Sequence, residues 1–219
     1  MKRSLLFLLL AVAPLFAAAP DQLERDLGLG LAYCRVHTLP AGLPVAAAKP
    51  RPLVLDLRYA RGDDSAASVL GAWLKFHSSA ATPVFVLVNA GTASAILSYF
   101  TAHEPPAGLV TLGPATPAFE PDIPLKISPA TERAAYDALE HGTPVEVLLA
   151  DHSTKPRHDE AAIAQERTGS PQDPAAADDS TLDPPVGAPA TPAPPPPLAD
   201  YSLQRAVNLH RTLLALRKL

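Results

Sequence analysis

Proline is unusually frequent in this chain: 26 of its 219 residues are proline, about 12% against a usual share of roughly 5%. Charged residues make up only 18% and hydrophobic residues reach 47%, so the average combines two different compositions. A uniformly disordered chain is excluded, because it would lack the dense runs of valine, leucine and isoleucine found here. Two large globular domains are also disfavoured, since the proline-rich part must first be subtracted from the length.

The first nineteen residues have the composition of a secretory signal peptide. Lys2 and Arg3 form a short basic start, an apolar run covers Leu5 to Phe16, and three alanines at 17–19 offer a cleavage site. The apolar run is shorter than the ~20 residues that span a bilayer. We therefore expect an exported protein, periplasmic or secreted after cleavage, with no membrane span elsewhere in the chain.

The predicted elements of the core alternate between strands and helices from residue 20 to residue 150. The sequence predicts strands at Leu31–His37, Pro52–Arg58, Pro83–Asn89, Gly108–Leu112, Asp122–Ile127 and Val145–Ala150, and helices at Ser65–His77, Thr92–Phe100 and Ser128–His141. The near-continuous apolar strands are typical of strands that are buried on both faces. This pattern predicts a layered α/β domain.

Apolar periodicity disappears between Asp151 and Ala199. This stretch holds eleven prolines and carries eight acidic against three basic side chains, a composition that predicts a disordered, polyproline-like insert. The last segment, residues 200–219, regains helical periodicity and begins with Asp200 as a possible cap. We expect it to form an amphipathic helix that docks back onto the core; a helix that binds a partner is the alternative.

No sequence pattern points to a metal, a cofactor or a nucleic acid. The seven histidines are scattered, and none has the spacing of a zinc motif such as HExxH. His152 and His158 lie near acidic residues, but at the start of the predicted insert, where we interpret them as solvated. The net charge is −4, and the sequence has no cluster of basic residues of the kind that binds nucleic acid. Cys34 is the only cysteine; it excludes an internal disulfide, and we expect it to be half-buried on a strand.

Two junctions carry the residues best suited to chemistry. The strand LVLDLR is followed by a loop with Gly62, and the strand VFVLVN is followed by Gly91 and a helix with Ser94 in its first turn. A hydroxyl at a helix N-terminus lies near unpaired backbone donors and the positive end of the helix dipole. Ser94 is therefore a candidate nucleophile, with the N–H groups of Gly62 and Ala95 as candidate oxyanion donors. From spacing alone, small residues that let the helix pack tightly on the sheet explain the second junction better.

These junctions resemble those of the C-terminal processing (tail-specific) serine peptidases, which have the ClpP/crotonase-like fold. LDLRYARGD is similar to the family's DLRxNxGG-like motif at Asp56, Leu57, Arg58 and Gly62, and VLVNAGTASA is similar to its nucleophile motif at Val88, Asn89, Gly91, Ala93 and Ser94. The resemblance covers roughly Leu31 to Ile127 and the last helix. It implies that Ser94 occupies the nucleophile position and that Gly62 is the oxyanion glycine.

The departures from the family pattern bear on activity. The resemblance implies a lysine base about 25 residues after the serine, and this position is Phe119. Lys126 is the nearest lysine and would need a shifted loop to serve; the second oxyanion-loop glycine is Asp63. A phenylalanine cannot accept the proton of the serine hydroxyl, and loss of a base typically removes about 10²–10⁴-fold of the rate.

Three functions remain open on the sequence. The first is an exported, serine-peptidase-like domain that is catalytically inactive and binds a peptide or protein, for example by β-augmentation. The second is an active serine hydrolase that uses Ser94 with Lys126 or a histidine as its base. The third is a structural scaffold of the cell envelope. The sequence sets neither the ligand nor the oligomeric state.

Overall fold

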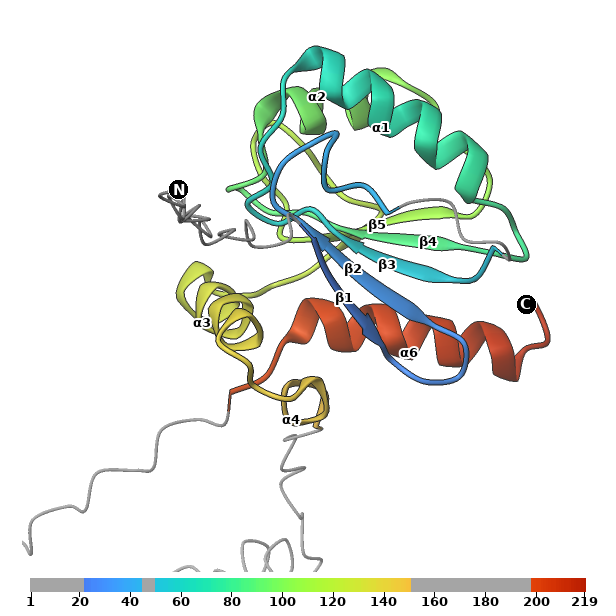
Figure 1. The fold of residues 1–219 in the computed structure, drawn as a ribbon, viewed down its shortest axis with the longest axis vertical. Helices are drawn as coiled ribbons and strands as arrows, with labels where there is room; N and C mark the ends of the chain where they lie inside the picture. Colours follow the sequence, from blue (N-terminus) through green and yellow to red (C-terminus); the bar gives the residue numbers. More distant parts are fainter. Residues whose placement is uncertain (1–21, 45–49, 151–197) are drawn as a thin grey trace, which may run out of the picture.

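The computed structural model describes residues 22–44, 50–150 and 198–219, which form a mixed six-stranded sheet with helices on both faces (Figure 1). In sheet order the strands are β1 (Gln22–Asp26), β2 (Ala32–Val36), β3 (Leu53–Asp56), β4 (Val84–Leu87), β5 (Leu109–Gly113) and β6 (Ile123–Pro124). The helices are α1 (Asp64–His77), α2 (Ser94–Ala102), α3 (Pro129–Glu140), α4 (Val145–Leu149) and α6 (Tyr201–Ala215). The predicted layered α/β class is confirmed.

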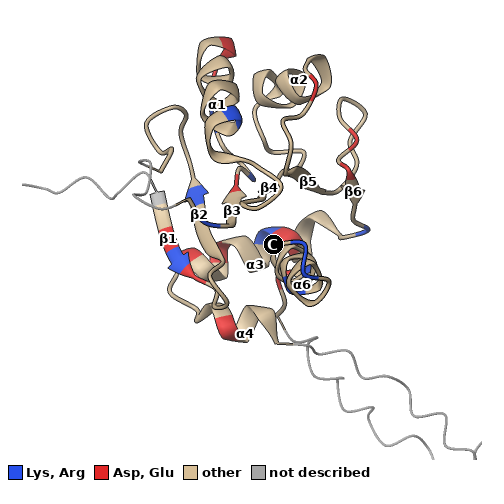
Figure 2. Ribbon diagram, turned by 90° about the vertical axis from the view of Figure 1, so that its right-hand side faces the viewer, with Lys and Arg blue, Asp and Glu red and all other residues tan. Residues whose placement is uncertain are grey.

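The order of the strands in the sheet follows their order in the chain, and this decides where the helices lie. β2 to β6 pair in parallel, whereas β1 and β2 form an antiparallel hairpin. Crossovers between parallel strands are right-handed, so successive crossovers in one direction place α1 and α2 on the same face. The opposite face is covered by the segments that follow in the chain, α3, α4 and α6 (Figures 1 and 2).

Two apolar clusters fill the spaces between the sheet and these helix layers. Successive side chains of a strand point to opposite faces, and the central strands are apolar on both. Leu55 and Val86 pack under α1 and α2, whereas Val54 and Phe85 pack against the layer of α3, α4 and α6. All four side chains are 0% exposed, which explains the near-continuous apolar runs of β3 and β4 in the sequence.

Short polar side chains begin three of the helices. Asp63, Ser128 and Asp200 each accept a hydrogen bond from a first-turn N–H of α1, α3 and α6, respectively. Such caps satisfy backbone donors that have no partner inside the helix. Gly142 follows α3 with a φ of 89°, the left-handed conformation with which glycine commonly ends a helix.

The predicted strand at Val145–Ala150 is wrong, because this segment forms the short helix α4. Val145 and Leu148, three residues apart, are buried, whereas Val147 is 48% exposed. A strand would have placed Val145 and Val147 on the same face. The apolar composition of the segment was read correctly, but its period is that of a helix.

The structure adds a strand that the sequence analysis did not predict. β1 is short and polar at its centre, with Glu24 and Arg25 exposed, and it pairs with β2 through a turn in which Gly28 and Gly30 have φ values of 81° and 78°. These positive values explain the two glycines of the LGLGL segment at residues 27–31. Charged residues on an edge strand discourage pairing with other chains.

Cys34 lies on β2, as predicted for a strand, but it is buried to 1% exposure rather than half-buried. Burial raises the pKa of its thiol to about 12. The thiol therefore stays protonated at neutral pH, and Cys34 packs as a small apolar residue of the cluster under α1 and α2.

Helix α6 packs on the sheet beside α4, although the two are far apart in the chain (Figure 1). Leu203, Ala206 and Val207 are buried against the sheet, and Gln204 Nε2 donates to the carbonyl of Ala150 at 2.9 Å. The predicted signal peptide and residues 151–197 of the predicted insert lie outside the described residues; the last two residues of the predicted insert, Leu198 and Ala199, are described, and Ala199 is buried. Within the described ranges, no helix combines the length and apolar character needed to cross a bilayer.

Candidate functional site

The two loops that carry Gly62 and Ser94 lie next to each other at the carboxyl edge of the sheet. They follow β3 and β4, which are parallel neighbours and so end at the same edge. The Ala93 N–H donates to the carbonyl of Ala60 at 2.9 Å, and the Thr92 hydroxyl donates to the carbonyl of Leu57 at 2.9 Å. These bonds hold the start of α2 against the loop after β3.

Asn89 shapes the turn between β4 and α2. Its Oδ1 accepts a hydrogen bond from the Gly91 N–H at 2.9 Å, and its own N–H donates to the Thr92 hydroxyl at 3.0 Å. A Cβ at Gly91 would overlap the ring of Tyr59, so this position requires glycine. Tyr59 itself has a φ of 61°, a conformation that costs energy for a tyrosine and that often occurs near binding sites.

Ser94 is the first residue of α2 and is exposed. In the part of the chain that the structure describes, its hydroxyl forms no hydrogen bond, and the N–H groups of Gly62 and Ala95 have no acceptor. Gly62 packs between the loop after β2 and helix α1, because a Cβ there would lie 3.2 Å from Cβ of Leu39 and 3.3 Å from Cβ of Ala66, and 3.7 Å from Cδ1 of Ile96 in α2. The structure therefore brings together three of the predicted site residues, Gly62, Ser94 and Ala95, with two unused backbone donors.

Phe119 lies elsewhere. It lines a cavity of about 450 Å³ together with Tyr99 and Phe100 from the last turns of α2, and the centroids of its ring and that of Phe100 are 6.0 Å apart. Ser94 and Gly62 do not line this cavity. At the position where the resemblance implies a lysine, this chain thus carries an aromatic ring that packs against the apolar cluster of the α1/α2 face.

No lysine or histidine of the described residues is hydrogen-bonded to the Ser94 hydroxyl. Lys126 is exposed beyond β6 and forms no hydrogen bond or ion pair with a described residue. His152 and His158 fall in the range that the structure does not describe.

A buried ionic network lies under this edge, on the face covered by α3 and α6. Arg58 Nε and Nη2 donate to the two carboxylate oxygens of Asp56 at 2.9 and 2.7 Å, and its Nη1 and Nη2 donate to those of Asp200 at 3.0 and 2.8 Å. The side chains of Arg58, Asp56 and Asp200 are 0%, 0% and 1% exposed. Asp200 is also the cap of α6 and lies 142 residues after Arg58 in the chain. The network therefore fixes the start of a helix that is distant in sequence from the strand it packs against.

Asp56 remains ionised within the network. Burial alone would raise the pKa of its carboxyl, but the charge and hydrogen bonds of Arg58, together with the charge of Arg35, outweigh burial and lower the pKa to about 2. The Tyr33 hydroxyl donates to Asp56 at 2.7 Å and accepts a hydrogen bond from Arg35 Nε at 3.0 Å. Asp56 and Arg58 belong to the LDLR motif, and in this structure both are fully buried parts of the framework.

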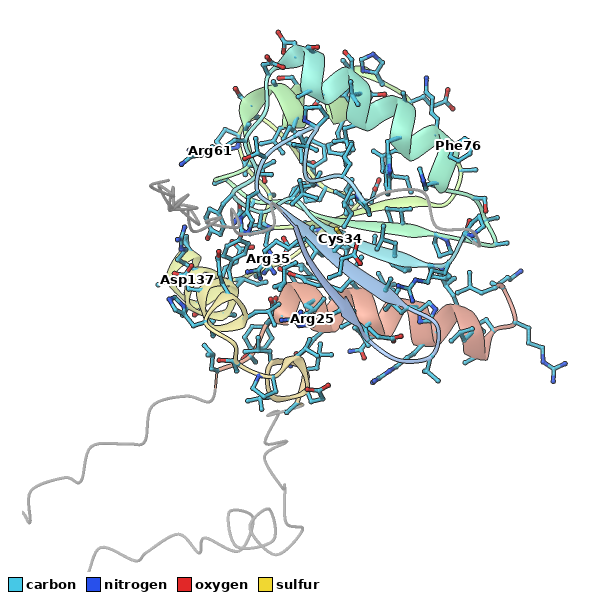
Figure 3. All side chains as sticks on the ribbon, in the orientation of Figure 1. Arg25, Cys34, Arg35, Arg61, Phe76 and Asp137 are labelled. Carbon is cyan, nitrogen blue, oxygen red and sulfur yellow. The ribbon has the colours of Figure 1, made fainter. Side chains whose placement is uncertain are left out.

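Arg35 joins the network to α3. It is 0% exposed, its Nη1 donates to the carbonyl of Tyr136 at 2.9 Å, and its Cζ lies 3.7 Å from the centre of the Tyr136 ring. Figure 3 shows Arg35 between the sheet and α3. Arg35 escaped sequence analysis because the predicted strand at Leu31–His37 reads as mostly apolar.

Glu132 is the second buried group that sequence analysis missed. It lies on α3, is 5% exposed, and accepts a hydrogen bond from Asn89 Nδ2 at 3.2 Å, so α3 contacts the turn that precedes Ser94. Burial raises the pKa of its carboxyl, and among the described residues its Oε1 has no hydrogen-bond partner. Its place with Tyr136 and Leu139 on one helical face was the signal that could have identified it.

A polar cavity of about 280 Å³ opens between α3 and the loops after β2 and β3. It is lined by His37, Thr38, Tyr59, Arg61, Arg133, Tyr136 and Glu140. Tyr59 and Tyr136 pack edge to face with ring centroids 4.8 Å apart. Arg61 directly precedes Gly62 in the chain and Tyr59 packs on Gly91, so the cavity adjoins the Gly62–Ser94 junction.

The described residues contain no group of three or more histidine, cysteine, aspartate and glutamate side chains arranged to hold a metal ion. The chain matches no protein-family model and no curated protein. Any function assigned to this edge of the sheet therefore depends on the geometry described above.

Proposed function

We propose that this protein is an exported, serine-peptidase-like domain of the ClpP/crotonase-like fold that binds a peptide without cleaving it. The observation that carries the proposal is the 280 Å³ cavity lined by Tyr59 and Arg61, from the loop that also carries Gly62, while the Phe119 ring lies in another cavity. This cavity lies outside the carboxyl ends of β2 and β3, among loops that a rigid sheet holds in place, and binding residues commonly lie on such loops.

The fold assignment is supported by the sheet and by the two loops. The parallel strands follow one another in chain order, and both crossover helices cover one face. The loops that resemble the family's motifs are hydrogen-bonded to each other through Ala93 and Ala60. The export of the protein is a proposal that depends on the composition of its first nineteen residues.

The chemistry of the junction favours binding over catalysis. A serine hydroxyl needs an acceptor for its proton before it attacks a carbonyl carbon, and in the described part of the chain none is bonded to Ser94. The N–H groups of Gly62 and Ala95 have no acceptor among the described residues. They would serve a peptide carbonyl as donors in a stable complex, which needs no proton transfer.

The outer edge of β5 is not a good place for strand addition. β6 pairs only with the last two residues of β5, so the rest of this edge is not covered by a strand. The backbone donors along it are nevertheless occupied, because the N–H of Thr111 donates to Asp122 Oδ2 at 2.8 Å and the N–H of Leu109 donates to the carbonyl of Pro106. We therefore place the peptide at the carboxyl edge of the sheet rather than along β5.

The experiment is a binding measurement followed by recovery of the ligand. The full-length chain is titrated with a degenerate pool of extended octapeptides, and binding is followed by chemical-shift changes in amide NMR spectra. The masses of the recovered peptides are then measured by mass spectrometry. We expect saturable shifts at Tyr59, Arg61 and Gly62, full recovery of intact peptides, and the same result for Ser94→Ala. Cleaved peptides in the wild type alone, or no saturable shifts, would overturn the proposal.

An active serine hydrolase is the second candidate, and one observation favours it. Ser94 is exposed at the positive end of α2, and the N–H groups of Gly62 and Ala95 have no acceptor among the described residues, as donors that stabilise an oxyanion require. Its base would be Lys126 or a histidine brought in by a loop movement. The recovery of cleaved peptides separates this candidate from the first.

A further inference from the structure

The polar cavity at the carboxyl edge has more hydrogen-bond donors than the described residues use. The Arg61 guanidinium forms no hydrogen bond or ion pair with any of them. Arg133 uses only its Nε, which donates to Asp137 at 2.8 Å, so its two Nη groups have no acceptor within the described ranges. Two planar guanidinium groups with unused N–H donors thus line one cavity.

The walls of the cavity are held in position by aromatic contacts. The Cζ of Arg133 lies 4.7 Å from the centre of the Tyr59 ring, and this ring packs edge to face on Tyr136. Tyr136 is 3% exposed and rests on the buried Arg35. A side chain that is already fixed loses little entropy when it binds a ligand.

The acidic groups near the cavity already have cationic neighbours. Glu140 on α3 lies 3.6 Å from His37 Nε2 and 3.8 Å from Arg35 Nη1, and Asp137 accepts from Arg133. Arg61, on the loop after β3, is left without an acidic partner among the described residues. Figure 3 shows Arg61 and Asp137 on the same side of the molecule, the side at which the strands end.

We propose that this cavity binds a carboxylate group of the peptide, with Arg61 and Arg133 as its donors. A guanidinium presents two parallel N–H groups that match the two oxygens of a carboxylate. The carboxylate is either the C-terminus of the peptide or an acidic side chain, because both have the same chemistry. This inference rests on the proposed peptide-binding function and adds the ligand chemistry that the cavity selects.

The test compares three pools of N-acetylated tetrapeptides on the full-length chain by amide NMR spectroscopy. The first pool lacks Asp and Glu and has free C-termini; the second is the same pool as C-terminal amides; the third consists of amides with Asp at one position. We expect saturation by the first or third pool, with affinity at least about tenfold above that for the second. The pool that binds more tightly identifies the source of the carboxylate.

Substitutions then connect the selectivity to the two arginines. Arg61→Gln and Arg133→Gln should each lower the affinity for the preferred acidic pool by about tenfold. Arg133→Lys should not retain the wild-type affinity, because lysine lacks the planar fork of the guanidinium. Arg205→Gln, on the exposed side of α6, is the matched control and should change affinity less than twofold. Arg61 is exposed and has no side-chain partner among the described residues, so its replacement should leave folding intact.

The outcomes separate this inference from the function on which it rests. Equal binding of all three pools would overturn the carboxylate site and leave peptide binding standing. Binding of sodium acetate as tightly as of the acidic peptides would retain the anion site and overturn peptide recognition. No saturable shift with any pool would overturn both the carboxylate site and peptide binding. An affinity for the acidic peptides that is unchanged in both Arg61→Gln and Arg133→Gln would overturn the carboxylate site alone.

Discussion

The two faces of the sheet are stabilised in different ways. Under α1 and α2 the buried cluster is apolar, with Leu70, Val86 and Ile96 each 0% exposed. Under α3 and α6 the apolar cluster is joined by a network of buried charges centred on Arg58. Figure 2 marks charged residues on β2 and β3 and on the helices α3 and α6 of that second layer.

The difference follows from how each layer is connected to the sheet. α1 and α2 are crossovers, so the short loops at their ends already set their positions. The start of α6 is not fixed in this way by a neighbouring strand, and hydrophobic burial is non-directional. Bidentate ion pairs between Arg58 and two carboxylates are directional, so we infer that they specify where the helix begins.

The largest expected effect comes from removing the centre of the ionic network. Arg58→Met leaves Asp56 and Asp200 buried without their cation, which should cost about 3–5 kcal/mol of unfolding free energy. This loss of unfolding free energy is measured by urea unfolding, monitored by circular dichroism. Arg205→Met on the exposed side of α6 is the control, with a change of about 0.5 kcal/mol or less. A loss below about 1 kcal/mol for Arg58→Met would show that the network does not hold α6.

On the apolar face, Leu70→Ala should cost about 2–4 kcal/mol through lost burial and a residual cavity. The damage should stay on that face: hydrogen exchange is expected to accelerate in α1 and α2 while the amides of α6 keep their protection relative to the sheet. In Asp200→Ala, which removes a cap and an ion pair, α6 should lose protection first. Equal loss of α6 protection in both variants would contradict the distinction between the faces.

Most of the fold was predictable because local patterns determine it. The apolar runs of β3 and β4, the caps Ser128 and Asp200, and the glycine after α3 each depend on residues close together in sequence. α4 was predicted as a strand because five residues give too few positions to separate a period of two from one of 3.6. β1 was missed because its centre is charged.

The candidate site was predictable only in part. Gly62, Ser94 and Ala95 were predicted from strand–glycine–helix patterns, and the structure shows that the loops that carry them are hydrogen-bonded to each other. The pairing of Arg58 with Asp200 joins residues 142 positions apart, and no sequence pattern encodes such a contact. The polar cavity likewise depends on the position of α3 against the sheet.

Acid should weaken the ionic face selectively through Asp56. Its folded-state pKa of about 2 lies below the unfolded value of roughly 3.9, so the unfolded chain binds the proton more tightly. The resulting stability, about 2 kcal/mol, is present above about pH 4 and is lost as the pH falls toward 2. Urea unfolding at pH 5, 4, 3 and 2 should give a shallower decline for Asp56→Asn than for the wild type, and parallel declines would contradict the assignment.

Glu132 should respond with the opposite sign. Burial raises its folded-state pKa, so the folded protein binds the proton more tightly and the contribution of Glu132 to stability falls as the pH rises from acid to neutral. Glu132→Gln removes this penalty and should raise the unfolding free energy at pH 7 by about 1 kcal/mol. Destabilisation by Glu132→Gln at pH 7, measured in the same urea experiment, would show that the charged form is needed in the fold.

The claim that the protein binds without catalysis is tested most directly by covalent labelling of Ser94. The full-length chain and Ser94→Ala are incubated with a fluorophosphonate probe, with trypsin as the positive control, and labelling is measured by intact-protein mass spectrometry. We predict no mass shift in either protein under conditions that label trypsin completely. A shift in the wild type that is absent from Ser94→Ala would show an activated nucleophile and contradict the account.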